Sequence, residues 1–304
     1  MENKKQDTAG KSNMIKRIIT GIIMGVIGLA CFSAGGWYLF VLIGIFVVAG
    51  ALELVKILQH KGFYPFKSIA IAMCILFLFI FKTQRLDVFP LAMTIGAISS
   101  FFAVLFNGRQ PYIANISGTI FCFVYSFLPC YILLVREIES KYTINFDLLS
   151  FKSGFYFLWM IFFAVLFTDV FAYFIGKKYG KRKLAPIVSP KKTVEGSIAG
   201  ATGAILVSLV IGALINLPWY HSFMLGVVIT TFAQLGDLCE SLIKRDAGVK
   251  DSGQALAGHG GFLDRADSYI FSLPAAYFYL QLFVIDNSKI TAMIEFLKGF
   301  INGI

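Results

Sequence analysis

Charged residues are scarce in this sequence. They make up 14% of its 304 residues, whereas a soluble globular domain carries about 25%. Hydrophobic residues account for 58% of the chain, and 32 residues are phenylalanine. Because so little of the chain suits a water-exposed surface, the composition excludes an ordinary soluble enzyme, a disordered chain and a fibrous repeat. It indicates a polytopic membrane protein.

C-x-x-C pairs and internal repeats are also missing, and we expect no cleavable signal peptide. No C-x-x-C pair occurs, and all cysteines lie within or at the ends of apolar stretches, so we expect small buried hydrophobic residues rather than disulfides or zinc ligands. The polar residues 1–17 precede an apolar run without a small-residue cleavage motif. The lack of a repeat gives no support to an inverted-repeat transporter. The cysteines are Cys31, Cys74, Cys122, Cys130 and Cys239.

Long apolar runs are abundant instead. A membrane-spanning helix needs about 20 apolar residues, and we predict an all-α fold, a polytopic transmembrane helical bundle of about nine spans. The third, eighth and ninth segments are short, so we expect polar turns buried in protein to complete them. The nine segments are Ile18–Gly35, Trp37–Leu58, Phe66–Phe81, Val88–Phe106, Ile113–Val135, Gly154–Ile175, Ser197–Leu217, Met224–Cys239 and Tyr269–Val284.

The distribution of polar residues divides the predicted bundle. We expect residues 1–17 to form a basic cytoplasmic N-terminus, residues 18–153 a transmembrane scaffold, residues 154–284 the transmembrane catalytic region and residues 285–304 a C-terminal tail. The small residues from Gly196 to Gly200 fit a close contact between two helices.

Loop charges indicate the orientation. With a cytoplasmic N-terminus and nine alternating spans, 20 lysines and arginines fall inside and 7 outside, as the positive-inside rule requires. The net charge of +10 then reflects these loops and anionic lipid headgroups. We expect the lipid bilayer, and no nucleic acid, as a partner. The predicted location is the cell (inner or plasma) membrane, with the active site facing the cytoplasm.

Polar chemistry concentrates between residues 169 and 267, which hold eight of the 17 acidic residues and 11 of the 27 basic ones. Lys and Arg side chains suit phosphate oxygens, and Mg²⁺ prefers one or two carboxylates together with substrate phosphates. This stretch therefore favours a metal-dependent reaction on a phosphorylated substrate, against the alternative of a solvated cytoplasmic loop. The acidic residues are Asp169, Glu195, Asp237, Glu240, Asp246, Asp251, Asp264 and Asp267.

The stretch from Ser241 to Asp267 resembles the signature of the phosphatidate cytidylyltransferase family (CDP-diacylglycerol synthases). Residues 236–238 and 189–196 also resemble the family, as do Asp169, Ala172, Tyr173, Gly176 and Gly180. The chain departs from the pattern at Ala257, where Pro or Gly is usual, and at Ala266, where a bulky apolar residue is usual. The matching signature positions are Ser241, Lys244, Arg245, Lys250, Asp251, Leu256, His259, Gly260, Gly261, Asp264, Arg265 and Asp267.

The resemblance implies a reaction of phospholipid biosynthesis, in which CTP and phosphatidate give CDP-diacylglycerol and pyrophosphate. It also implies Mg²⁺, with a second metal ion conceivable in the same site. Asp237 and Asp264 resemble the family's metal-binding carboxylates, and Asp267 is a further metal candidate. The expected catalytic residues are Lys244, Arg245, Asp251, His259 and Arg265. The expected substrate-binding residues are Lys191, Lys192, Thr193, Ser241, Lys250, Gly260 and Gly261.

Structural roles compete with several of these assignments. Asp251 and Asp267 suit salt bridges to neighbouring bases as well as they suit metal binding. Two other functions also compete. A CTP-dependent polyprenol or dolichol kinase would transfer the γ-phosphate, and a transporter would use Asp169 inside the bilayer. A homodimer is expected from the resemblance alone.

Overall fold

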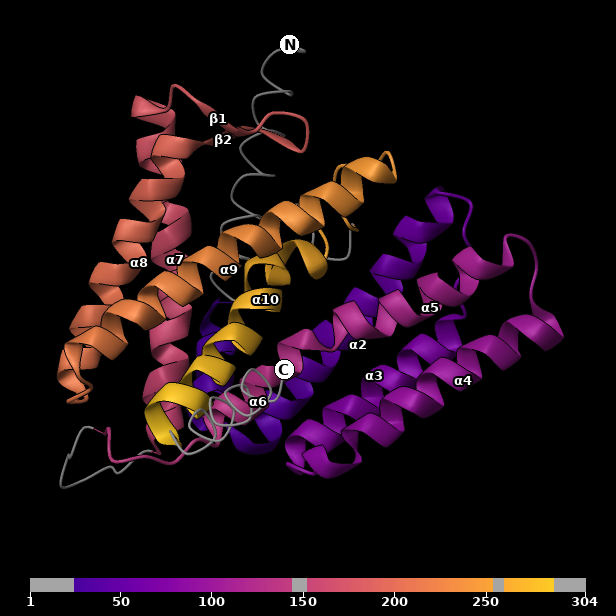
Figure 1. Ribbon diagram of the computed structural model, residues 1–304, viewed down its shortest axis with the longest axis horizontal. Coiled ribbons are helices and arrows are strands. Elements are labelled where there is room, and N and C mark those ends of the chain that lie inside the picture. Colours follow the sequence, from indigo (N-terminus) through magenta and orange to yellow (C-terminus); the bar gives the residue numbers. More distant parts are fainter. Residues whose placement is uncertain (1–24, 144–151, 254–259, 287–304) are drawn as a thin grey trace, which may run out of the picture. The chain divides into compact units, whose positions relative to one another are not determined.

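The computed structural model describes residues 25–143, 152–253 and 260–286 (Figure 1). Within these ranges, seven helical stretches are long and apolar enough to cross a membrane. The prediction of an all-helical, multi-pass membrane protein is therefore confirmed. The seven stretches are Gly36–His60, Leu86–Asn107, Tyr112–Arg136, Ser153–Tyr179, Val194–Leu214, Trp219–Asp246 and Leu263–Ile285.

The chain forms two compact units. The first unit comprises Met1–Leu133 and Cys239–Asp267, and the second comprises Leu134–Leu238 and Ser268–Ile304. Two helices, α9 (Trp219–Asp246) and α10 (Leu263–Tyr279), contribute residues to both units.

Phenylalanine builds the core of the first unit. The ring of Phe77 on α3 has its centroid 5.2 Å from Phe89, 5.9 Å from Phe123 and 4.9 Å from Phe127. Asn115 on α5 is buried and accepts a hydrogen bond from the backbone N–H of Tyr64, which fixes the loop after α2. The helices of this part are α2 (Gly36–His60), α3 (Lys67–Lys82), α4 (Phe89–Asn107), α5 (Tyr112–Ser126) and α6 (Tyr131–Arg136), the last of which continues into the second unit.

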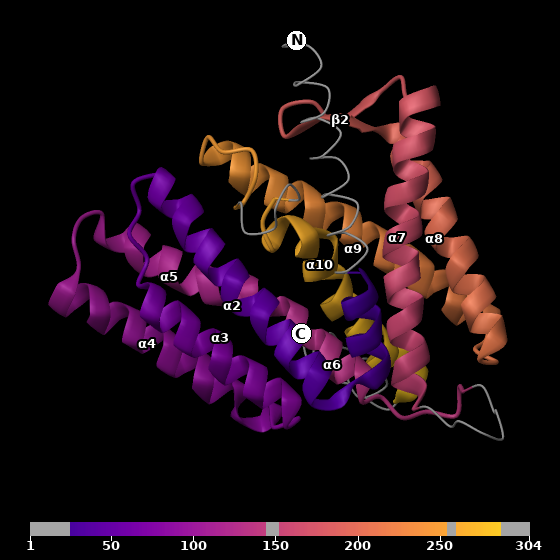
Figure 2. The same cartoon turned by 180° about the vertical axis from the view of Figure 1, so that it is seen from behind.

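Small residues bring two helices of the second unit together. Helices α7 (Ser153–Tyr179) and α8 (Val194–Leu214) lie side by side in both views (Figures 1 and 2). A Cβ atom placed on Gly200 would lie 2.6 Å from the carbonyl oxygen of Thr168, and one on Gly196 would lie 2.7 Å from that of Ala172. The close helix contact predicted for this segment is thereby confirmed.

A β-hairpin that the sequence pattern did not predict joins α7 to α8. Strand β1 (Lys183–Ala185) pairs antiparallel with β2 (Ser189–Thr193). Thr193 ends β2 and caps α8, since its Oγ1 accepts a hydrogen bond of 3.2 Å from the N–H of Gly196. Glu195 accepts hydrogen bonds from the backbone N–H groups of Lys181 and Arg182. These bonds tie the hairpin to the start of α8.

Two of the nine predicted spans do not reach the length of a full crossing in the described residues. The first is represented by the helix Gly25–Ala34, and the third by α3 with 16 residues. At 1.5 Å per residue, α3 spans roughly 24 Å of a hydrocarbon core about 30 Å thick. The eighth and ninth segments are extended by polar turns, as expected, to Trp219–Asp246 and Leu263–Ile285. The predicted C-terminal tail, residues 285–304, lies outside the described residues from residue 287 onward.

Candidate functional site

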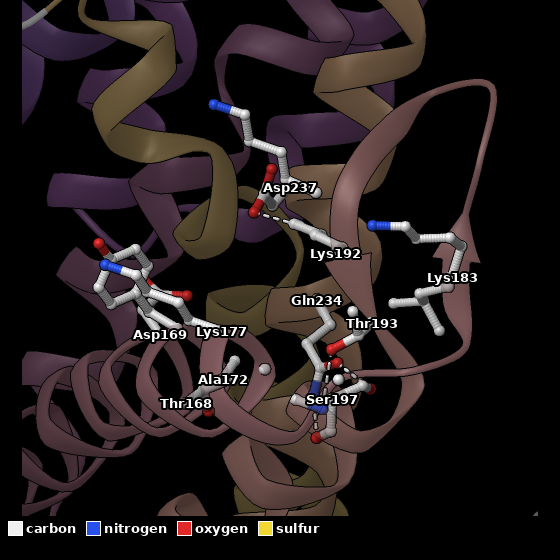
Figure 3. A pocket seen from close by; sticks show the side chains of 16 residues that line it. Thr168, Asp169, Ala172, Lys177, Lys183, Lys192, Thr193, Ser197, Gln234 and Asp237 are labelled. Atoms are coloured by element: carbon white, nitrogen blue, oxygen red, sulfur yellow. Dashed lines mark hydrogen bonds and ion pairs between the residues drawn. The ribbon is translucent and has the colours of Figure 1, made fainter.

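A pocket of about 620 Å³ lies among α7, α8, α9 and the β-hairpin of the second unit (Figure 3). Its lining includes four residues that the sequence placed in the site: Lys191, Lys192, Thr193 and Asp237. The lining also includes residues in and just after α7 that carry the family resemblance, namely Asp169, Ala172, Tyr173, Gly176 and Gly180. Residues far apart in the chain, such as Asp169 and Asp237, thus meet in one cavity.

Positive charge dominates this pocket. Four lysines line it: Lys177, Lys183, Lys191 and Lys192. Lys192 Nζ donates a hydrogen bond to Asp237 Oδ2 (Figure 3). Asp169 lies close enough for the charges of both partners to act on it. A cavity with several ammonium groups and two carboxylates suits a substrate with several phosphate groups.

Part of the pocket lining forms a small polar network. Gln234 Nε2 donates to Thr230 Oγ1 over 3.0 Å and to the carbonyl oxygen of Ser197 over 3.3 Å. The hydroxyl of Ser197 donates in turn to Gln234 Oε1. Sequence reasoning missed both Gln234 and Ser197. The available signal was a polar side chain within an apolar helix, which is costly unless it is paired and often marks a site.

Gly176 on α7 and Gly180, which follows α7, allow the hairpin to approach. A Cβ atom on Gly176 would lie 2.9 Å from Thr193 Oγ1, and one on Gly180 would lie 2.6 Å from the same atom. Thr193 therefore packs against α7 while it caps α8. A contact between Thr193 and substrate stays a prediction.

A second polar cluster lies in the first unit and is built from the signature stretch. Lys244 is buried, and its Nζ lies 2.5 Å from Asp264 Oδ1 and 3.1 Å from Glu240 Oε1. The charges of Asp264 and Asp267 also act on Glu240, whose side chain is only 2% exposed. Lys244 thus lies between two carboxylates, and the charge of a third acts on one of them.

Asp264 organises the turn before α10. Its Oδ2 accepts hydrogen bonds from Ser252 N (2.9 Å), Ser252 Oγ (2.9 Å) and Gly261 N (2.8 Å). Gly260 has φ +81°, and a Cβ atom there would lie 2.6 Å from Asp264 Oδ2. The two signature glycines therefore let the backbone wrap closely around this carboxylate.

A residue of the predicted scaffold joins this cluster. Glu53 on α2 is buried. Its carboxylate accepts hydrogen bonds from the N–H groups of Phe262 and Leu263 and shares the Ser252 hydroxyl with Asp264. Sequence reasoning missed Glu53. The signal that would have found it is a lone acidic residue inside an apolar span, which needs partners.

The remaining predicted residues lie mostly at the surface. Arg245, Lys250, Asp251 and Arg265 are exposed, and Arg245 Nη1 donates to the carbonyl oxygen of Val249 over 3.2 Å. Ser241 and Asp267 are half-buried. His259 lies outside the described residues, as do Leu256 and Ala257.

The carboxylates of the pocket fit a divalent cation that substrate phosphates help to bind. In the described part of the chain, no group of three or more His, Cys, Asp or Glu residues is placed to hold a metal ion. Mg²⁺ commonly uses only one or two carboxylates together with phosphates, and Asp237 and Asp169 line the pocket beside the lysines. Both oxygens of Asp264, in contrast, already accept protein hydrogen bonds. Metal binding by Asp264 and Asp267 stays a prediction.

The fold and the pocket define a multi-pass membrane protein with a lysine-rich cavity. A model of the cytidylyltransferase family matches residues 15–283. The chain therefore belongs to this family, as the signature between Ser241 and Asp267 predicted.

Individual relatives agree with this assignment. The phosphatidate cytidylyltransferase of Synechocystis sp. is 33% identical over 294 residues, which cover 90% of this chain and 99% of that protein. Phosphatidate cytidylyltransferase 5, chloroplastic, of Arabidopsis thaliana is 30% identical over 307 residues, 93% of this chain and 75% of that protein. The phosphatidate cytidylyltransferase of Bacillus subtilis is 48% identical over 118 residues, 38% of this chain and 44% of that protein.

Proposed function

We propose that this chain is a CTP:phosphatidate cytidylyltransferase, a nucleotidyltransferase of phospholipid biosynthesis that makes CDP-diacylglycerol and pyrophosphate. Membership of the family over residues 15–283 carries the proposal. The relatives that match most of the chain bear the same enzyme name.

The chemistry explains why a site for this reaction needs many cations. A phosphate oxygen of the lipid attacks the α-phosphorus of CTP, and the bond from that phosphorus to the β-phosphate bridging oxygen breaks. The electron pair of that bond leaves with pyrophosphate. Because the attacking phosphate is already anionic, the enzyme mainly has to bring repelling anions together and stabilise the leaving group.

The pocket of the second unit supplies such cations. Lys191 and Lys192, with Lys177 and Lys183, would hold phosphate oxygens of the bound substrates. Lys192 is half-buried against Asp237, so its ammonium group is already oriented before a phosphate arrives. This arrangement lowers the entropy lost on binding.

We include Mg²⁺ in the proposal as the cofactor of the enzyme. Asp237, with Asp169 beside it, would hold the ion in the pocket, and a bound ion would neutralise charge that builds up on the phosphate oxygens. Asp237 and Asp169 would then keep the phosphates near the lysines, and Lys192 would exchange its carboxylate partner for a phosphate oxygen.

We base the orientation on loop charge and on the order of the helices. If α2, α3 and each later long helix cross in turn, the β-hairpin opens on the side that holds the most Lys and Arg. We assign that side to the cytoplasm, where CTP is made available, and the bilayer to the cell (inner or plasma) membrane. A homodimer is part of the proposal on the family resemblance alone.

Labelled CTP tests the reaction. The purified chain in detergent is given phosphatidate and CTP that carries the radiolabel at either the α- or the γ-phosphate. We expect α-label in the lipid product and γ-label only in pyrophosphate. Transfer of γ-label to a lipid would contradict the proposal and favour a CTP-dependent lipid kinase.

A further inference from the structure

Glu53 lies in α2, far from the signature in sequence, yet it is bonded to the residues that begin α10. Its Oε1 accepts a hydrogen bond of 3.0 Å from the N–H of Phe262, and its Oε2 accepts one of 2.9 Å from the N–H of Leu263. The side chain is buried, with 5% of the residue exposed. All of these residues belong to the first unit.

These contacts amount to a helix cap supplied by another helix. The first N–H groups of a helix have no partner within it, and α10 begins at Leu263. A carboxylate near a helix N-terminus both accepts these N–H groups and interacts favourably with the helix dipole. Glu53 therefore fixes where α10 begins relative to α2.

The same carboxylate reaches Asp264 through a serine. Ser252 Oγ lies 3.0 Å from Glu53 Oε2 and 2.9 Å from Asp264 Oδ2. A hydroxyl has one proton, so it donates to one of these carboxylates at a time. Ser252 therefore links the two acidic side chains and keeps them at a fixed separation.

Two glycines show how closely the backbone surrounds Glu53. A Cβ atom on Gly253 would lie 2.6 Å from Glu53 Oε1, and one on Gly261 would overlap both Ser252 Oγ and Glu53 Oε2. Both positions thus need glycine for this carboxylate to fit. Packing within the protein therefore explains why glycine is needed at the second Gly of the His-Gly-Gly signature.

We infer that Glu53 is a positioning residue, which caps α10 from α2 and holds the Asp264 carboxylate in place through Ser252. This inference rests on the proposed function, because the signature that includes Asp264 implies the reaction. Glu53 itself touches neither substrate nor reacting atoms in this role.

The variant Glu53→Gln tests the inference with little change in size. A glutamine side chain presents an N–H₂ group where one carboxylate oxygen stood, so at least one of the three donors loses its acceptor. We expect kcat to fall roughly 10- to 100-fold, as for other partners that orient a site residue, with a smaller change in KM for CTP. The carboxylate-preserving variant Glu53→Asp is expected to recover part of this loss.

A matched control separates positioning from general stability. Asn115 is also buried in the same unit, and among the residues that the structure describes its side chain bonds the backbone of Tyr64 and Arg109 but no residue of the signature. We expect Asn115→Ala to lower the thermal stability about as much as Glu53→Gln, while the kcat of the folded fraction stays near that of the wild type. An equal loss of kcat in both variants would overturn the inference.

A double-variant cycle tests the path through Ser252. If Glu53 acts on Asp264 through this hydroxyl, Glu53→Gln and Ser252→Ala combined should lower kcat little further than the more severe single variant. Independent, multiplying losses would contradict the proposed path. If Glu53→Gln does not fold, the kcat of Ser252→Ala alone still tests the path through this hydroxyl.

Trypsin gives a readout that needs no enzyme activity. Lys250 is exposed and lies just before the anchored turn. Loss of the anchor should make cleavage after Lys250 several-fold faster in Glu53→Gln than in the wild type or in Asn115→Ala. Equal rates in all three would overturn the anchoring, whereas a wild-type chain that transfers no cytidylyl group would overturn the proposed function instead.

Discussion

Lys192 on β2 donates a hydrogen bond to Asp237 on α9, 45 residues further along the chain. The pair places a cation and a carboxylate in the same lysine-rich pocket, with each half-buried. A phosphate group that enters this pocket meets an ammonium group that is already oriented. The pair therefore supports a binding site for phosphates within the membrane protein.

Removal of this ammonium group should reduce turnover strongly. We expect Lys192→Gln to lower kcat roughly 100-fold, because an oriented charge that stabilises developing negative charge is typically worth that much. Lys178 on α7 is the control, since it is exposed and does not line the pocket. The measurement is the rate of CDP-lipid formation by purified protein. Equal activity of the two variants would remove Lys192 from the site.

The second prediction concerns the stability of the first unit, in which Lys244 is buried. Lys244→Met would leave Glu240 and Asp264 without the ammonium group that now lies within 3.1 Å of both. Loss of one partner from a buried ion pair typically costs about 3–5 kcal/mol. We therefore expect a clear drop in the thermal unfolding temperature in detergent.

A second variant separates the two roles of Lys244. Glu240→Gln combined with Lys244→Met removes the excess negative charge and should restore much of the stability. If Lys244 also contacts substrate, activity stays low in the stable double variant. Recovery of activity together with stability would limit Lys244 to a structural role.

The signature glycine nearest Glu53 provides a third prediction. In Gly261→Ala, the added Cβ would overlap Ser252 Oγ and Glu53 Oε2, so the turn before α10 must move. Displacement of site groups by about 1 Å can cost roughly 100-fold in rate, and we expect a loss of that order. Gly28→Ala is the matched control, because in the described part of the chain no atom lies within 4 Å of its Cβ position. Activity assays and unfolding temperatures of both variants check the prediction.

The sequence predicted the membrane class and the signature, but not how the polar residues are partnered. Apolar run length reports burial in a bilayer directly, so α2, α4 and α7 lie close to their predicted positions. The polar ends of α9 and α10 carry no such signal, because their burial depends on protein neighbours.

The contacts that the sequence pattern could not reveal join residues that are far apart in the chain. Glu53 is 199 residues from Ser252, and no local periodicity relates the two. The hairpin of β1 and β2 is similar, because its short strands gain stability from the bonds between Glu195 and the chain before β1. Lys244 was predicted as a catalytic residue, and its burial between two carboxylates became apparent only from the fold.

The most direct test of the central claim measures α-labelled CTP incorporation into lipid by the wild type and by Asp237→Asn, with Mg²⁺, after chelation, and after Mg²⁺ is restored. The account predicts CDP-lipid formation by the wild type that stops on chelation and returns with Mg²⁺. It predicts that Asp237→Asn inserts normally but loses roughly 100-fold or more of the activity at every Mg²⁺ concentration. Undiminished labelling by the chelated wild type, or wild-type labelling by Asp237→Asn, would contradict it.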